Sequence, residues 1–285
     1  MAKEHQVDLR ELASLPGSGA GGRVNKHDLE SYLAGNKGKK PSAWSTKTSG
    51  TTVGRTEVFP MDNMRKVIAK NMVLSKTTAP HVNSIGEVDL THLVKFREGI
   101  KDQFKQQEGI NLTYSHFIMF ALVKALKEFP TVNASIDGDN IVLKKYINIG
   151  CAVAVEKGLV VPVIKDADRL SLGGLAKATD DLAKKARANK LTMDDLSDGT
   201  FTFTNNGSFG TLMATPIILQ PQVGIYCAGI IQKRVMVMAD DSIAIRSMMY
   251  GTHTYDHRLV DGAVGGSFLE SVHRNLREMD AAKLL

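Results

Sequence analysis

The sequence contains few cysteines and no long apolar run. Its two cysteines, Cys151 and Cys227, lie in separate apolar, strand-like runs, and neither belongs to a Cys-x-x-Cys or metal-spaced cluster. This pattern argues against a disulfide framework and favours buried thiols in a reducing compartment. No apolar run approaches the roughly 18 residues of a membrane span, and residues 1–30 lack the apolar core of a signal peptide. We therefore expect no membrane segment and no metal.

Excess charge is also scarce, since the net charge is +6 and the chain has no long arginine or lysine tract. Nucleic-acid binding needs a clustered basic patch interleaved with aromatic side chains. The nearest approach is the cluster of Lys37, Lys39 and Lys40, which lies in a polar stretch. We interpret this cluster as part of a charged linker and expect no nucleic-acid partner.

The most informative stretch is residues 255–262, which reads Tyr-Asp-His-Arg-Leu-Val-Asp-Gly and contains a His-x-x-x-Asp-Gly motif. It follows a strand-like run at residues 243–249 and precedes a helix-like run at residues 264–279. A histidine, with an unperturbed pKa of about 6.5, can take and return a proton near neutral pH. Taken alone, such a motif is more often a surface pair or a charge at a helix start.

A second stretch, residues 201–207, ends another strand-like run in hydroxyls and amides. One stretch offers a base and the other offers hydrogen-bond donors, which is the minimum set for acyl transfer. Together they closely resemble the catalytic domain of the dihydrolipoamide acyltransferases, the core components of 2-oxo acid dehydrogenase complexes. The matching residues are Asp256-His257-Arg258 with Asp261-Gly262, Gly199-Thr200-Phe201-Thr202 with Thr204-Asn205, and Thr215-Pro216-Ile217-Ile218.

The resemblance implies transfer of an acyl group between dihydrolipoamide and coenzyme A, with the lipoyl group carried on a domain absent from this chain. His257 would be the general base that takes the thiol proton, and Thr204 the donor to the tetrahedral oxyanion. Thr202 is the neighbouring alternative, which we expect on the opposite face of the strand. Asp261 would support the site by holding an arginine such as Arg258 and by shaping the turn that follows it.

Residues 1–36 combine short helical signals with a glycine loop, and they resemble the peripheral subunit-binding domain of the same acyltransferases, truncated at its N-terminus. Arg23, Lys26 and Arg10 would then meet acidic residues of a 2-oxo acid decarboxylase or a dihydrolipoamide dehydrogenase. The loop also matches Gly-x-Gly-x-x-Gly, but no strand precedes it, which argues against dinucleotide binding. Residues 37–56 indicate a flexible linker, which leaves residues 57–285 for the catalytic domain.

Helix and strand signals are mixed beyond residue 57, without strict βαβ alternation. Helices are expected after Asp62, at residues 89–107, at 113–129, after Ser171 up to Arg187, and at 264–279. Apolar β-rich runs lie within residues 140–164 and 201–250, the last of them at 243–250. This order predicts an α+β fold with a mixed sheet covered by helices, and the resemblance implies a chloramphenicol-acetyltransferase-like catalytic domain.

Three further histidines have simpler interpretations. His81 follows a proline at the start of a strand, where a structural role is the usual one, and His116 lies in an apolar and therefore buried helix. His253 and His257 have zinc-like spacing, but this spacing brings two ligands together on a helix, whereas this stretch indicates a strand. We expect none of the three to bind metal or to act as the base.

The resemblance further implies a homotrimer in a larger core, with His257 of one subunit meeting Thr204 of its neighbour. The lipoyl domain, the decarboxylase and the dihydrolipoamide dehydrogenase would be its partners, in a bacterial cytoplasm or a mitochondrial matrix. Two alternatives stay open: a stand-alone chloramphenicol-type acetyltransferase and a non-catalytic binding subunit. The acyl group also stays open, because residues 207–216 resemble the succinyl branch, residues 87–95 the branched-chain branch and residues 261–265 the acetyl branch.

Overall fold

The computed structural model describes residue 19 and residues 51–53, 55–155 and 158–284, and it divides into two units, residues 1–59 and 60–285. In the first unit, β1 (Thr51–Val53) pairs antiparallel with β2 (Thr56–Val58). Extended pairing therefore begins inside the stretch expected to be linker, because this stretch is rich in the β-branched residues that favour strands. The subunit-binding module, with Arg10, Arg23 and Lys26, lies outside the described residues apart from Gly19.

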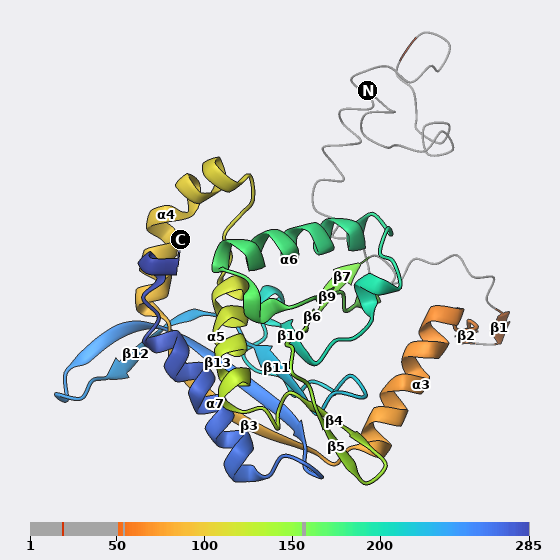
Figure 1. Cartoon of the computed structure of the whole chain (residues 1–285). Helices are drawn as coiled ribbons and strands as arrows, with labels where there is room; N and C mark the ends of the chain where they lie inside the picture. The colour runs from red at the N-terminus through yellow and green to blue at the C-terminus, as the bar shows by residue number, and fades with distance from the viewer. Residues whose placement is uncertain (1–18, 20–50, 54, 156–157, 285) are drawn as a thin grey trace. The chain divides into compact units, whose positions relative to one another are not determined.

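The second unit is built on a mixed seven-stranded sheet (Figure 1). Its strands are β3 (His81–Asp89), β6 (Ile149–Cys151), β9 (Val163–Ile164), β10 (Phe201–Asn205), β11 (Gly224–Ala228), β12 (Gln232–Val237) and β13 (Ile243–Asp256). The order is β12-β13-β11-β10-β6-β9, with β3 also paired to β13. β10 is parallel to β6 and β11, whereas β13 is antiparallel to all its neighbours. Two hairpins lie outside this sheet, β4 (Ala134–Asp137) with β5 (Asn140–Leu143) and β7 (Val153–Val155) with β8 (Gly158–Val160).

Among the described residues, four helices pack against this sheet or against one another, as predicted: α4 (Thr91–Glu108), α5 (Tyr114–Glu128), α6 (Leu172–Arg187) and α7 (Gly262–Arg277). A fifth helix, α3 (Asn63–Thr78), is exposed along most of its length and buries only Ser75. α5 contacts both α6 and α7, while α7 contacts β3 and α6 contacts β9. The N-caps expected at Asp62 and Ser171 are present, since their side chains accept the backbone N–H groups of Arg65 and Gly174. The α+β prediction is confirmed.

The core lies between α5, α7 and the sheet. Its largest fully buried side chains include Phe117, Phe201, Phe203, Tyr226, Tyr255 and Phe268. Cys151 and Cys227 are buried in this sheet, as predicted. No helix among the described residues is long and apolar enough to cross a membrane.

One boundary differs from the sequence prediction. β13 continues to Asp256, six residues beyond the predicted end at residue 250. The prediction was wrong because residues 251–254 read Gly-Thr-His-Thr, which lacks an apolar pattern. Both edges of this polar stretch are nevertheless paired, with β11 on one and β3 on the other, so its side chains are buried. The His-x-x-x-Asp-Gly motif therefore starts directly at the end of a long central strand.

Candidate functional site

His257 is the first residue after β13, and its side chain is exposed. Its backbone N–H donates to the Pro80 carbonyl at 2.9 Å, which ties the strand end to the residue that precedes β3. Its ring centroid lies 6.1 Å from that of Tyr255, which is buried in the core. The expectation of a histidine at a strand end is confirmed.

Asp256 and Arg258 fix the turn on which His257 lies. The Asp256 carboxylate is 1% exposed and accepts from the Arg258 Nε at 3.0 Å and from its Nη2 at 2.6 Å. It also accepts the Arg258 backbone N–H at 3.1 Å. The hydrogen bond that Arg258 donates to Asp256 raises the pKa of the Arg258 guanidinium above its ordinary value.

Asp261 does not hold Arg258, and this part of the sequence prediction was wrong. Arg258 pairs instead with Asp256, because the tight turn brings residues two apart into bidentate contact. Asp261 is the N-cap of α7, and its Oδ1 accepts the Val264 N–H at 2.8 Å. Its expected shaping of the turn is therefore confirmed as helix capping.

Thr204 lies near the end of β10 and is half-buried. Among the described residues, none makes a hydrogen bond with its hydroxyl. Thr202 and Thr204 share one face, because strand side chains repeat every two residues, so the expectation of opposite faces was wrong. Thr202 is instead excluded as a donor by its own bond, since its buried hydroxyl donates to the Gln222 Oε1 at 2.6 Å.

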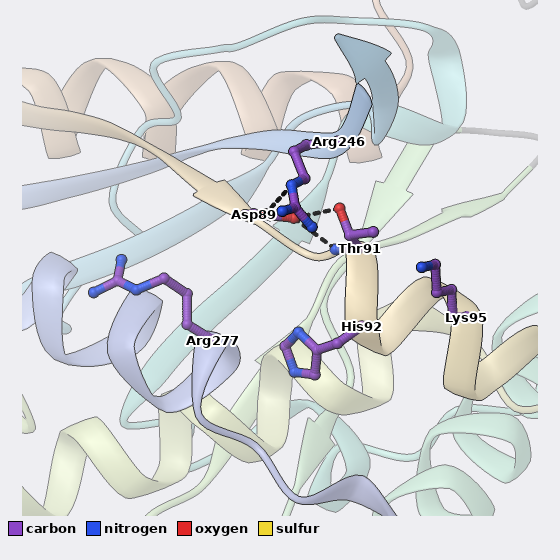
Figure 2. Close-up of a pocket in the computed structure, with 6 residues that line it drawn as sticks. All are labelled: Asp89, Thr91, His92, Lys95, Arg246 and Arg277. Atoms are coloured by element: carbon purple, nitrogen blue, oxygen red, sulfur yellow. Dashed lines mark hydrogen bonds and ion pairs between the residues drawn. The ribbon is translucent and has the colours of Figure 1, made fainter. Parts of the chain in front are cut away.

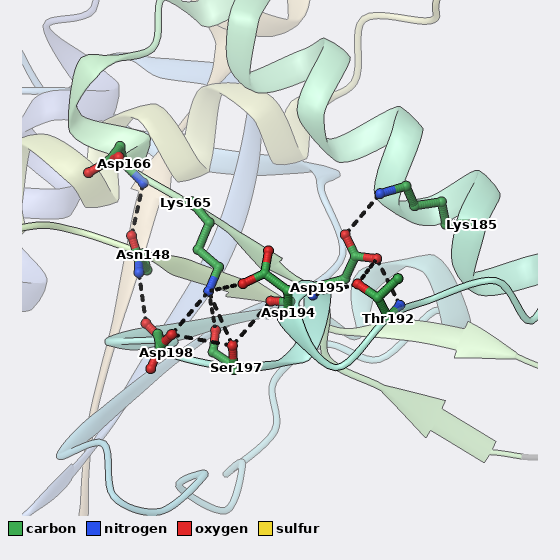
Figure 3. A network of polar contacts seen from close by, with 9 residues as sticks. All are labelled: Asn148, Lys165, Asp166, Lys185, Thr192, Asp194, Asp195, Ser197 and Asp198. Carbon is green, nitrogen blue, oxygen red and sulfur yellow. Dashed lines mark hydrogen bonds and ion pairs between the residues drawn. The ribbon is translucent and has the colours of Figure 1, made fainter.

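A polar network fixes the chain that leads into β10 (Figure 3). The Asn148 side chain accepts the Asp166 N–H and donates to the Asp198 carbonyl, each at 2.8 Å. Lys165 donates to the Ser197 carbonyl at 2.8 Å. These bonds connect the residues before β10 with those around β6 and β9, so the position of Thr204 is set by several elements.

His257 and Thr204 do not meet within one chain. Thr204 is in register with Cys227 on β11, and Cys227 with Thr252 on β13. His257 lies five residues beyond Thr252 along the chain. At about 3.3 Å per residue and about 4.8 Å per strand, the two residues are about 20 Å apart. The structure therefore gathers Asp256, His257 and Arg258 at one point but leaves Thr204 elsewhere on the sheet.

His81 and His116 make structural contacts, as predicted. The His81 ring bonds two backbone groups, and the His116 Nδ1 accepts the Thr113 N–H in the capping box of α5. His253 is fully buried on β13, and its ring stacks near Phe268 at 4.5 Å between centroids. Within the described part of the chain, no three His, Cys, Asp or Glu side chains could hold a metal ion.

A cavity of about 280 Å³ lies near the opposite end of β13 (Figure 2). It is lined by Asp89, Thr91, His92, Lys95, Arg246 and Arg277. Its arginines are already paired, because Arg246 lies 3.7 Å from Asp89 and Arg277 contacts Glu270. Arg246 precedes His257 by 11 residues of extended chain, which is more than about 30 Å. No motif in the sequence pointed to this cavity.

The comparisons with known proteins agree with the motifs. The family of 2-oxoacid dehydrogenases acyltransferases (catalytic domain) matches residues 53–284. The chain belongs to this family. A branched-chain lipoamide acyltransferase component from Bacillus subtilis is 40% identical over 98% of this chain and 70% of its own length. A succinyltransferase component of the 2-oxoglutarate dehydrogenase complex, from the same organism, is 41% identical over 100% of this chain and 68% of its own length.

Solved structures of family members share the fold. A probable dihydrolipoamide acetyltransferase from Listeria monocytogenes has a TM-score of 0.79 at 40% identity and covers 82% of this chain and 100% of its own. The acetyltransferase of Azotobacter vinelandii, studied for the role of a serine, a histidine and an asparagine in its mechanism, has a TM-score of 0.77 at 32% identity, covering 81% of this chain and 95% of its own. The catalytic-domain prediction is confirmed, although no module N-terminal to residue 53 is matched by the family.

Proposed function

We propose that this chain transfers an acyl group between dihydrolipoamide and coenzyme A, with His257 as the general base. The observation that carries the proposal is the exposed imidazole at the end of β13, held by Pro80 and flanked by the ion pair of the buried Asp256 with the partly exposed Arg258. The backbone of the base is fixed on both sides while its ring stays accessible to a thiol. Family membership supplies the reaction class.

The proton path follows from ordinary thiol chemistry. A free thiol has a pKa of about 8.5, so at neutral pH the coenzyme A thiol needs a base. The imidazole takes the thiol proton, and the thiolate attacks the thioester carbonyl carbon of the acyl-lipoyl group. A C–S bond forms, and the oxyanion accepts a hydrogen bond from the Thr204 hydroxyl. When the intermediate collapses, the lipoyl C–S bond breaks and the departing sulfur takes the proton from the imidazolium.

The separation of about 20 Å between His257 and Thr204 supports a site shared by two copies of the chain. Apolar side chains are exposed on α3, where Val67 is 58% and Val73 64% exposed. The β12–β13 hairpin exposes four aliphatic side chains that pair across it, Val235 with Ile245 and Val237 with Ile243. Exposed apolar side chains of this kind are typical of interfaces, which supports assembly of several copies, for which we propose a homotrimer. A relative of 33% identity forms the cubic core of a pyruvate dehydrogenase complex.

Its partners follow from the same family. We infer that the chain receives its acyl group from a lipoyl domain and associates with a decarboxylase and a dihydrolipoamide dehydrogenase through Arg10, Arg23 and Lys26. The curated relatives with 40% and 41% identity are components of such complexes in a bacterium, which supports a cytoplasmic location. Coenzyme A is a substrate in this scheme, and no step of the scheme uses a metal.

Two alternatives are weaker. A stand-alone acetyltransferase is disfavoured because relatives that match nearly the whole chain are components of dehydrogenase complexes. A non-catalytic binding subunit is disfavoured because both His257 and Thr204 are present. The acyl group requires a measurement, since relatives of nearly equal identity carry branched-chain and succinyl names.

The test is a coenzyme A-dependent assay with dihydrolipoamide and acetyl-, succinyl- or isobutyryl-coenzyme A. We expect His257→Ala to lower kcat by about 10²–10⁴-fold because the thiol loses its base. The matched control is His92→Ala, which removes an exposed histidine that lines the distant cavity and should keep wild-type activity. Equal activity of His257→Ala and wild type would refute the mechanism, and the preferred donor identifies the acyl group.

A further inference from the structure

An irregular segment, residues 211–222, connects the region after β10 to the start of β11. Its buried Ile218 offers a backbone N–H and a carbonyl that join no strand. The N–H donates to the His81 Nε2 at 3.0 Å, and the carbonyl accepts from the Ser75 hydroxyl at 2.6 Å. One peptide position is thus held from both sides by side chains that lie 137 and 143 residues away.

These bonds fix the tautomer of His81. A backbone N–H can only donate, so the Nε2 of His81 must be the acceptor and carry no proton. The proton then lies on Nδ1, which donates to the Ala79 carbonyl at 2.7 Å. His81 is therefore a neutral imidazole whose two nitrogens are both engaged by backbone groups.

Residues 79–81 also hold the backbone of the proposed base, His257. His81 is in register with Asp256, and the carbonyl of Pro80 accepts the His257 N–H at 2.9 Å. Residues 79–81 therefore contact the backbone of His257 through Pro80 and the segment 211–222 through the His81 ring. At its other end the segment meets β10, because Gln222 accepts the Thr202 hydroxyl.

We propose that His81 is a positioning residue for acyl transfer, which with Ser75 fixes the segment 211–222 relative to His257. The proposal rests on the proposed acyl transfer. The segment carries the exposed apolar side chains of Leu212 and Met213, each about two-fifths exposed, which can contact an acyl or pantetheine chain. A shift of the segment changes how a bound substrate is aligned with the base, and small misplacements have large effects on rate.

The experiment compares three substitutions at His81 and Ser75 with one control substitution on α3, the helix that carries Ser75. His81→Leu and Ser75→Ala each remove one hydrogen bond to Ile218. His81→Gln keeps an amide oxygen that can accept the Ile218 N–H. Thr77→Val is the control, because the Thr77 hydroxyl bonds only to carbonyls of its own helix. Activity and hydrogen exchange of residues 211–222 are measured well below the unfolding temperature.

We expect His81→Leu and Ser75→Ala each to lower kcat by about tenfold with little change in KM, and His81→Gln to restore most of the loss. The double variant should lose less than the product of the two single losses, since both bonds hold the backbone of one residue, Ile218. Exchange in residues 211–222 should accelerate in His81→Leu and Ser75→Ala but not in Thr77→Val.

Wild-type kcat together with unchanged exchange in His81→Leu overturns the proposal, as does a His81→Gln variant as impaired as His81→Leu. If the wild type itself transfers no acyl group, the proposed acyl transfer fails, and the catalytic role of His81 fails with it. In that case the exchange data still decide whether His81 holds the segment.

Discussion

The two ends of β13 differ in their surroundings, with a cavity at one end and the exposed His257 at the other. At its start, Arg246 lines a cavity with Lys95 and Arg277, and both arginines are paired with carboxylates. At its other end, His257 is exposed on a turn fixed by the Asp256–Arg258 ion pair and by the Pro80 carbonyl. The cavity is more than about 30 Å from the histidine proposed as the base.

The difference shows that the backbone of a site can be fixed within one chain even though that chain alone does not enclose the site. At one end of β13, the backbone of the proposed base His257 is fixed, but the proposed oxyanion donor Thr204 lies about 20 Å away in the same chain. A second copy would supply that donor. The cavity end is formed by one chain, and its two arginines already have carboxylate partners. A fixed backbone with an accessible side chain, rather than empty volume, marks the candidate site.

Removing the oxyanion donor should have the largest effect after loss of the base. We expect Thr204→Ala to lower kcat by about 10²–10³-fold with KM nearly unchanged, since the hydroxyl acts on the transition state. Co-expression of Thr204→Ala with His257→Ala should restore activity, because a shared site can take its histidine from one chain and its threonine from the other. Random mixing restores about a quarter of the sites. No recovery in the mixed oligomers would contradict the shared site.

The ion pairs at the two ends of β13 should differ in energetic weight. Asp256→Ala leaves Arg258 without its partner, and we expect the free energy of unfolding to fall by about 2–3 kcal/mol, less than for a fully buried pair because Arg258 is more than one-third exposed. Activity should fall by about tenfold as the turn loosens. Asp89→Ala, at the other end, should cost about 1 kcal/mol through the lost hydrogen bonds from Thr91 and leave activity intact. Chemical denaturation and the acyl-transfer assay measure both, and equal activity losses would remove the distinction.

His253 and His257 lie four residues apart but in opposite environments. Burial lowers the pKa of His253 to about 4, and burial does the same for His116 and His273. Between about pH 6.5 and pH 4 the unfolded chain therefore binds more protons than the folded chain. The free energy of unfolding is highest above about pH 6.5 and falls as the pH drops toward 4. Each histidine contributes up to about 1.4 kcal/mol per pH unit. In urea unfolding at pH 7.5, 6 and 5, His253→Phe should show a shallower loss than wild type, and an identical slope would contradict this account.

Capping by Asp261 should have the smallest effect. Asp261→Ala removes the acceptor of the Val264 N–H, and we expect a loss of about 1 kcal/mol in stability. Asp261→Asn keeps an acceptor oxygen and should match wild type in both stability and kcat. A large loss of kcat in the asparagine variant with stability unchanged would show that the carboxylate charge, and not the cap, matters.

Much of the fold followed from local signals. The helix after Ser171 was predicted to its last residue, because a serine cap and a clean apolar stripe mark its ends. The buried helix α5 was predicted from its continuous apolar run. The end of β13 was misplaced, because pairing on both edges buries polar residues that carry no apolar pattern.

The candidate site was predictable in its residues but not in its contacts. The strand-end position of His257 followed from the sequence. The partner of Arg258 did not, because Asp256 and Asp261 are both close to it in sequence and either could pair with it. The bonds from His81 and Ser75 to Ile218 span more than 130 residues and leave no local pattern. Contacts of that kind appear only when the chain is folded.

The placement of the two cysteines has a consequence for an enzyme that handles activated acyl groups. Burial raises the pKa of the Cys151 thiol to about 12 and that of Cys227 to about 11. Neither sulfur can become a thiolate near neutral pH or reach a thioester. The protein therefore offers no thiol of its own that could capture the acyl group, so the group passes between the sulfurs of the two substrates.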